Sequence, residues 1–242
     1  MKEMKLAIVG CVVIIGFAGC DLALVIQGSG VSTTEDREID DFSKIYFAGS
    51  GKATVKCGQD SSLAVTTDDN LLELIETTVS GDTLSITSKG SFSTKSDLQF
   101  DIGTGQVNSL TIDGSGKFDI VDCDSESFKL NINGSGNVTI TGNADNVDIS
   151  IAGSGFADLS QLTAKSAKVA VYGSGNVTVN ASDKVDVSIT GSGRIQYTGN
   201  PKVKKLIVGS GKIRQVKSEA NATNESDDES DAESTEEDEE ED

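Results

Sequence analysis

Apolar and polar residues alternate along most of the second half of the chain. In residues 134–152, one short run places Val138 and Ile140 on the same side, and a second run follows the same rule. Alternation with a period of two is typical of β-strands that bury one face. The pattern recurs in neighbouring units and predicts as core Phe118, Ile120, Phe128, Leu130, Ile132, Val147, Ile149, Ile151, Val177, Val179, Val185, Val187, Ile189, Ile195, Tyr197, Leu206 and Val208.

The tripeptide Gly-Ser-Gly marks these units at nearly regular intervals. It begins at positions 28, 49, 114, 134, 153, 173, 191 and 209, and from 114 onward successive copies are 18 to 20 residues apart. Glycine tolerates positive φ and the close approach of another backbone, so each copy predicts a tight corner between strands. The serine hydroxyls would then stack as a ladder along one edge. The candidate corner residues are Gly114, Ser115, Gly116, Gly134, Ser135, Gly136, Gly153, Ser154, Gly155, Gly173, Ser174, Gly175, Gly191, Ser192 and Gly193, and the ladder would continue to Ser210.

A repeat with a fixed period predicts a solenoid in which each unit forms one coil. One coil cannot bury its apolar face alone, but stacked coils share a core. We therefore expect an all-β fold, a single-stranded parallel β-helix with coils of about 19 residues. Alternation does not determine the hand of the coil, and a right-handed winding is the expectation. Residues 52–113 lack the tripeptide. They are expected to hold opening coils and an insertion that caps an exposed sheet edge, with a short N-capped helix at Asp69–Leu74.

The first 20 residues have the features of a bacterial export signal. Two lysines precede an apolar run from Leu6 to Phe17, which suits a signal peptide and is short for a membrane span. The run ends in Ala18-Gly19-Cys20, which resembles the lipobox of bacterial lipoproteins. The sequence predicts lipidation of Cys20 and attachment to a membrane through the lipid, with an uncleaved N-terminal anchor as the alternative. Both interpretations place the body in the cell envelope, outside the cytoplasm.

Negative charge is concentrated in residues 218–242. The chain carries 20 Lys and Arg against 39 Asp and Glu, and 14 of the acidic residues lie in this segment, which has no Lys or Arg. Its largest apolar side chain is alanine, so we expect it to be disordered. A solubilising role is the simplest interpretation, with weak Ca²⁺ capture or docking to a basic partner as alternatives. The predicted organisation is a signal peptide over 1–19, a tether and the start of the fold over 20–38, the β-helix domain over 39–217, and the acidic tail over 218–242.

Two cysteines remain in the body of the chain. Cys57 and Cys123 are 66 residues apart. In an oxidising compartment they could form a disulfide, which requires Cα atoms within about 7 Å of each other; buried free thiols are the alternative. Because the sequence has no Cys-x-x-Cys spacing, redox catalysis is not predicted.

Three sequence blocks occur in order around the repeat. The first runs from Ile39 to Gly51, the second from Asp68 to Ile86 and the third from Gly191 to Pro201. Together they resemble the head GIN domain family, over roughly residues 28–217 and without the acidic tail. The resemblance implies an exported, often lipid-anchored parallel β-helix described as an adhesin, with no defined catalytic residues. It gives a class of protein and names no ligand.

Composition narrows the functional classes further. The chain has no histidine, which excludes Ser-His-Asp and Cys-His catalytic centres and His-containing zinc sites. Its acidity argues against nucleic-acid binding. We therefore expect a non-catalytic envelope role with an unidentified surface ligand, and predict no cofactor, metal site or catalytic residue.

Two alternatives to this role remain. Coils could stack end to end between copies, because the ends of a β-solenoid are open edges. A β-helix carbohydrate-active enzyme is less favoured, since aspartates are common at turns and exposed aromatic platforms are scarce. Its acid and base would come from Asp119, Asp122, Asp124, Asp145 and Asp148.

Overall fold

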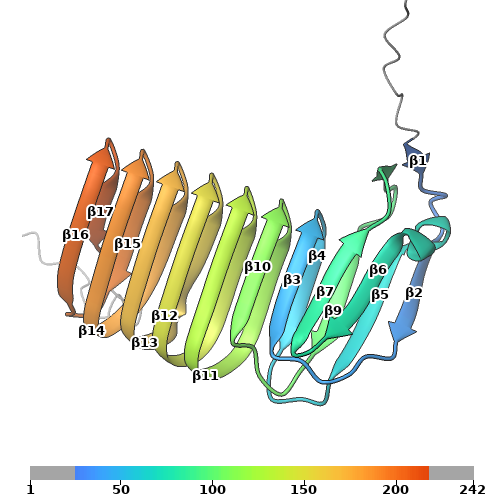
Figure 1. Cartoon of the computed structure of the whole chain (residues 1–242), viewed down its shortest axis with the longest axis horizontal. Coiled ribbons are helices and arrows are strands. Elements are labelled where there is room, and N and C mark those ends of the chain that lie inside the picture. Colours follow the sequence, from blue (N-terminus) through green and yellow to red (C-terminus); the bar gives the residue numbers. More distant parts are fainter. Residues whose placement is uncertain (1–24, 218–242) are drawn as a thin grey trace, which may run out of the picture.

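The structure is a computed structural model that describes residues 25–217 (Figure 1). Strands wind in successive coils along one long axis, and β2 and β16 lie at opposite ends of it. The elements are β1 (Ile26–Gln27), β2 (Ser32–Arg37), β3 (Lys44–Gly49), β4 (Lys52–Lys56), β5 (Ser62–Asp68), the 3₁₀ helix η1 (Asp69–Leu74), β6 (Ile75–Ser80), β7 (Thr83–Ser88), β8 (Phe92–Ser93), β9 (Gln99–Gly103), β10 (Ser109–Gly114), β11 (Lys117–Gly134), β12 (Asn137–Gly153), β13 (Phe156–Gly173), β14 (Asn176–Gly191), β15 (Arg194–Thr198), β16 (Lys202–Gly209) and β17 (Lys212–Gln215).

The coils stack in parallel register and form two faces. Each of the long strands β11 to β14 bends once, so that its two halves belong to different faces. Face 1 contains β6, β7, β3, β10, the C-terminal halves of β11 to β14, and β16. Face 2 contains β2, β5, β9, β4, the N-terminal halves of β11 to β14, β15 and β17. The prediction of an all-β parallel solenoid is confirmed.

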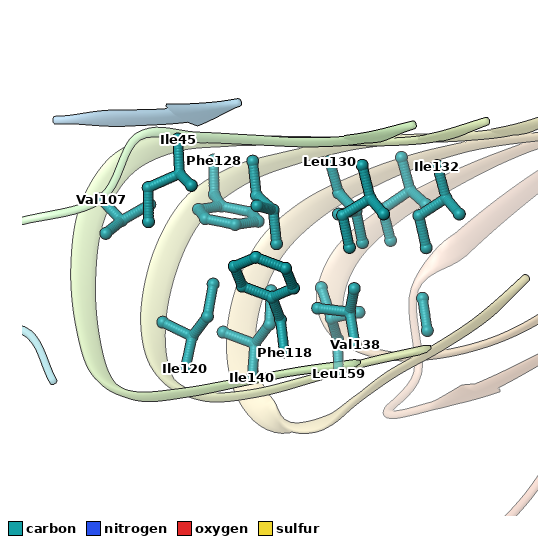
Figure 2. Packing of buried hydrophobic residues seen from close by; sticks show 14 of the residues in the cluster. Ile45, Val107, Phe118, Ile120, Phe128, Leu130, Ile132, Val138, Ile140 and Leu159 are labelled. Atoms are coloured by element: carbon teal, nitrogen blue, oxygen red, sulfur yellow. The ribbon is translucent and has the colours of Figure 1, made fainter. Parts of the chain in front are cut away.

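One continuous core fills the space between the two faces (Figure 2). Phe118 and Ile120 from face 2 point toward Phe128 and Leu130 from face 1, and all four are buried. At the N-terminal side, the ring of Phe47 packs edge-on against Phe100 and Phe118, with centroids 5.7 and 5.2 Å apart. The alternation thus predicts the core correctly from Phe118 to Ile195, with Tyr197 half-buried against it.

The Gly-Ser-Gly corners stack directly on one another from Gly49 to Gly209. Gly153 shows why both glycines are needed. Its φ is 132°, and a Cβ there would collide with the carbonyl oxygen of Gly134 one coil earlier. A Cβ on Gly155 would lie 2.8 Å from Cγ2 of the core residue Ile132. The first glycine therefore permits close stacking of coils, and the second leaves room for the core.

The N-terminal end is closed by antiparallel strands and η1, as the insertion between Gly51 and Gly114 predicts. β5 runs antiparallel to β9 and β2, and β6 runs antiparallel to β7. Arg37 on β2 joins the outermost strands of both faces: it donates hydrogen bonds to the carbonyls of Ile75 and Leu72, at 2.7 and 2.9 Å, and to Thr77 Oγ1 at 3.0 Å. The two faces are thus tied together at this end.

Asp68 holds the first Gly-Ser-Gly copy against the rest of the N-terminal end. This carboxylate is completely buried and accepts backbone N–H bonds from Gly30 at 2.7 Å, Lys95 at 2.8 Å and Ser96 at 3.2 Å. Burial alone would raise the pKa of Asp68, but these donors outweigh it and the pKa is lowered. Gly28–Gly30 is therefore no corner of the stack. Asp68 is also the N-cap residue of η1, one position before the Asp69 that the sequence predicts for this role. The Asp68 side chain makes no capping hydrogen bond.

The prediction for the last coil is wrong by one residue. Leu206 and Val208 were expected in the core, but they are 64% and 58% exposed. Because Gly209 stacks on Gly191, Ile207 pairs with the buried Ile189 and occupies the inward row instead. A shift of one residue moves every side chain of a strand to the other face.

Candidate functional surface

A ladder of alternating charges crosses the outer side of face 1. In register across consecutive strands lie Lys129, Asp148, Lys168, Asp186 and Lys204. The Lys168 ammonium lies 3.7 Å from Asp148, and Asp186 pairs with Lys184 at 2.5 Å. Opposite charges on neighbouring strands support the sheet and leave the row close to neutral. The ladder residues recur every 18 to 20 positions, so the period that reveals the corners could also have revealed this ladder, which the sequence interpretation missed.

Beside the ladder, the parts of β12, β13 and β14 on face 1 present small side chains and Tyr172. Ser150, Ala170 and Ser188 lie in one row, and the next row passes through Ala152 to Tyr172. Tyr172 is 54% exposed, whereas its neighbours in the row have much smaller side chains. The Tyr172 ring therefore projects beyond the small side chains around it. Exposed tyrosines of this kind are enriched where proteins contact partners.

A polar cluster fixes the same face nearer the N-terminal end. Asp113 accepts hydrogen bonds from the Tyr46 hydroxyl at 2.8 Å and from Asn133 Nδ2 at 2.7 Å, which links β3, β10 and β11. The bonds from Asn133 and Tyr46 lower the pKa of Asp113, and the bond to Asp113 raises the pKa of Tyr46. The carboxylate therefore stays ionised, and the hydroxyl stays protonated, at neutral pH.

The predicted serine ladder is an exposed ridge between the two faces. The serines from Ser115 to Ser210 are all exposed and follow the stacked corners. Backbone atoms make the repeating bond here: the N–H of Ser154 donates to the carbonyl of Gly134 at 2.9 Å, and the other coils repeat this contact. Since these serines are exposed, the ridge presents their hydroxyls to solvent.

The aspartates of the enzyme alternative lie on different parts of the solenoid: Asp119 is on face 2, Asp148 is on face 1, and Asp124 follows the buried Cys123. Asp119 lies 3.6 Å from Lys117, Asp145 lies 2.8 Å from Lys165, and Asp148 belongs to the charge ladder. Asp122 has a φ of 59° and sits where β11 bends, which is a turn role. Within the described residues, no three acidic or cysteine side chains gather in a way that could hold a metal ion. An open hollow of about 590 Å³ lies over β4, β5 and β9, and Lys56, Arg37 and Asp101 are among its polar lining.

The structure brings Cys57 and Cys123 together at the bend opposite the glycine corners. Both thiols are free and buried, and the N–H of Cys57 donates to Val121 two residues before Cys123. Their mutual hydrogen bond lowers the pKa of Cys57, while the same bond, with burial, raises the pKa of Cys123. Disulfide formation between them stays a prediction.

Three of the sequence predictions lie outside the described residues. They are the signal peptide over 1–19, the lipidation site Cys20 and the acidic tail over 218–242. Among residues 25–217, no helix has the length and apolar character needed to cross a membrane.

Residues 41–201 match the family model described as "Putative auto-transporter adhesin, head GIN domain". The chain belongs to the head GIN domain family. No curated protein matches it.

Several solved structures resemble this head GIN chain. A putative lipid binding protein from Parabacteroides distasonis is 27% identical, with a TM-score of 0.55, over 80% of this chain and 100% of that one. A putative adhesin from Bacteroides fragilis is 22% identical, with a TM-score of 0.64, over 79% of this chain and 100% of the other. A putative adhesin from Parabacteroides merdae is 20% identical, with a TM-score of 0.57, over 79% and 99%. The latter two support the fold alone.

Proposed function

We propose that this protein is exported, lipidated at Cys20, and displayed outside the cytoplasm as a non-catalytic, adhesin-like binding protein. Family membership supports the adhesin-like class. The apolar run Leu6–Phe17, followed by Ala18-Gly19-Cys20, supports export and lipidation. A solenoid tethered at its N-terminal side would hold its long faces free for contact.

The character of the surface supports binding rather than catalysis. Asp119, Asp145 and Asp148 are each paired with a lysine, and Asp119 lies on face 2 whereas Asp148 lies on face 1. Glycoside hydrolysis requires two carboxyl groups flanking one bond. The hollow beside Lys56 is open and is lined largely by polar residues, whereas small-molecule sites are lined mostly by apolar side chains.

We assign the contact surface to the outer side of face 1. Tyr172 supports this choice, because it is 54% exposed beside a row of serine and alanine that separates it from the charge ladder. An aromatic ring surrounded by small side chains can seat against a partner without a steric barrier. Face 2 offers a natural comparison: Phe156 is 40% exposed there, across the serine ridge from Tyr172.

Lipidation is tested on native protein extracted with detergent. Mass spectrometry should find a diacyl or triacyl modification on Cys20, and a Cys20→Ser variant should lose it. Protease added to intact cells should digest the body of the wild-type protein. An unmodified, full-length N-terminus, or complete protection from the protease, would refute the display of a surface lipoprotein.

The contact face is tested by attachment of producing cells to mucin-coated glass under flow. Tyr172→Ser should reduce attachment, whereas Phe156→Ser should leave it near the wild-type level, at equal surface amounts of protein. Equal attachment by cells that lack the protein would remove the adhesive role. An effect of Phe156→Ser alone would move the contact to face 2.

A lipid-binding role, suggested by the name of the 27% identical relative, has less support. A lipid tail needs an apolar cavity, and the space between the faces is filled by side chains such as Ile132 and Ile151, which are fully buried. The hollow near Lys56 is lined largely by polar residues. We therefore favour contact through the outer face.

A further inference from the structure

The last coil is basic in a chain that is otherwise acidic. From Val187 to Lys217 there are seven Lys and Arg residues and no Asp or Glu, although the whole chain has 39 acidic residues. Asp186, on the preceding coil, is the last acidic residue before this stretch. We call residues 187–217 the terminal coil.

The cations of the terminal coil surround the open end of the solenoid. Lys202 and Lys204 on β16 occupy the outward rows of face 1, and Lys212 and Arg214 on β17 occupy the outward rows of face 2. Lys205 pairs in register with the buried Val187, so it lies in the inward row at the end of the core and is exposed. Among the described residues, no ion pair joins these five side chains to a carboxylate.

The same end exposes sheet edges and apolar side chains. Within residues 25–217, β16 pairs with β14 and β17 pairs with β15, and each has its other edge open. Val203, Leu206 and Val208 are 38%, 64% and 58% exposed on β16. An open edge with apolar side chains can template pairing with another chain unless it is covered or repelled.

The segment that follows has the complementary charge and is already attached. Residues 218–242 begin three positions after the end of β17 and hold 14 acidic residues and no basic one. An extended chain spans about 3.3 Å per residue, and neighbouring strands are only about 4.8 Å apart. The 25 residues of this segment are therefore long enough to reach along both β16 and β17. A tether this short gives a local concentration of about the millimolar range, which a partner in solution rarely reaches.

We propose that residues 218–242 dock on the terminal coil and cover the open edges of β16 and β17. Their carboxylates pair with the lysines and arginine of these strands on both faces. The docked segment shields Leu206 and Val208 from a second copy of the chain.

Hydrogen exchange of the full chain tests this docking. The first variant changes the 14 acidic residues of 218–242 to Asn or Gln and keeps the length. We expect the amides of β16 and β17 to exchange several-fold faster in this variant, and 0.5 M NaCl to bring wild-type exchange to the same rate, because salt screens the attraction. Unchanged exchange in β16 and β17 would overturn the proposal.

A second variant removes the cations instead: Lys202→Gln, Lys204→Gln, Lys212→Gln and Arg214→Gln together. It should reproduce the faster exchange, whereas the matched control Lys52→Gln with Lys117→Gln, at exposed sites far from the terminal coil, should not. Equal effects of both sets would show that loss of overall charge is responsible and would refute specific docking.

The occupant is identified by sedimentation and vesicle binding. If the segment is the occupant, the acid-neutralised chain should associate with itself, and it should bind vesicles of phosphatidylglycerol and phosphatidylcholine more tightly than the wild type does. If the wild-type chain binds these vesicles as tightly as the acid-neutralised chain, and binding is lost when the cations are removed, an anionic membrane occupies the terminal coil. That result would refute docking of residues 218–242.

Discussion

The two ends of this solenoid solve the problem of an exposed sheet edge in different ways. At the N-terminal end, Arg37 and Asp68 fasten β2, η1 and β6 over the core through hydrogen bonds to backbone groups. At the C-terminal end, no part of residues 25–217 covers β16 and β17 in this way, and Leu206 is exposed among these residues. Repeat proteins need distinct terminal caps because each coil contacts only its neighbours. The N-terminal end is therefore closed by hydrogen bonds between its own strands, whereas the C-terminal end presents a cluster of basic side chains.

The largest difference between the ends should appear in the core. Phe47→Ala should reduce the free energy of unfolding by about 4 kcal/mol, since it removes the ring that packs on Phe100 and Phe118. Ile207→Ala, at the half-buried C-terminal end, should cost about 1 kcal/mol. Urea denaturation measures both. Similar losses would show that the two ends are equally well packed.

Oxidation of the thiol pair should strengthen the N-terminal side. A disulfide between Cys57 and Cys123 would close a 66-residue loop and stabilise the fold by about 3 kcal/mol. A mild disulfide oxidant such as oxidised glutathione would accept the two electrons and two protons of the thiols and be reduced to its own thiols. Intact mass should fall by about two hydrogens, and Cys57→Ser should prevent both changes. Thiols that stay reactive after this treatment would contradict the pairing.

Between the two ends, the stability of each coil should depend on its Gly-Ser-Gly corner. Gly153→Ala should cost about 2 to 3 kcal/mol, because its positive φ and its contact with Gly134 both disfavour a side chain. Gly105→Ala is the matched control, since a Cβ there meets open space. The measurement is thermal unfolding. Equal melting temperatures for Gly153→Ala and Gly105→Ala would show that the corner glycine is not required.

The sequence predicts the coils well because each rule is local and repeated. Alternation and Gly-Ser-Gly identify the inward rows from Phe118 to Ile195. The last coil was harder to predict, because β16 contains two competing alternations with two apolar residues each, and stacking of Gly209 on Gly191 turns Val203 and Ile207 inward in place of Leu206 and Val208. Arg37 and Asp68 contact residues about 27 to 40 positions away, without any local pattern that marks the pairs. Tertiary hydrogen bonds of this kind are decided by the assembled fold.

Arg37 offers a direct way to weaken the closed end. Arg37→Met keeps most of the apolar stem but leaves the carbonyls of Leu72 and Ile75 without their donor, which should cost about 2 kcal/mol. Hydrogen exchange should accelerate in β2 and β6 and stay unchanged in β13. Arg194→Met, at an exposed site on β15, is the control and should have almost no effect on stability. Equal losses would mean that the N-terminal end gains nothing from this contact.

The smallest expected effect is the loss of stability at low pH through protonation of Asp68. The pKa of Asp68 is lowered in the folded protein despite its burial, by the N–H groups of Lys95, Ser96 and Gly30. A carboxyl with a lowered folded pKa contributes stability that is fully present above its unfolded pKa, near 3.8, and is lost as the pH falls through the folded value. Asp68→Asn should therefore destabilise the protein at pH 6, because the NH2 group of the amide would face backbone N–H groups that need an acceptor. The difference in free energy of unfolding between this variant and the wild type should become smaller below pH 3.8. The exposed Asp97→Asn should give a smaller difference at every pH, since the pair of Asp97 with Lys52 is open to solvent. Unfolding curves for Asp68→Asn and wild type that stay equally far apart from pH 6 to pH 3 would show that ionised Asp68 does not fasten the N-terminal end.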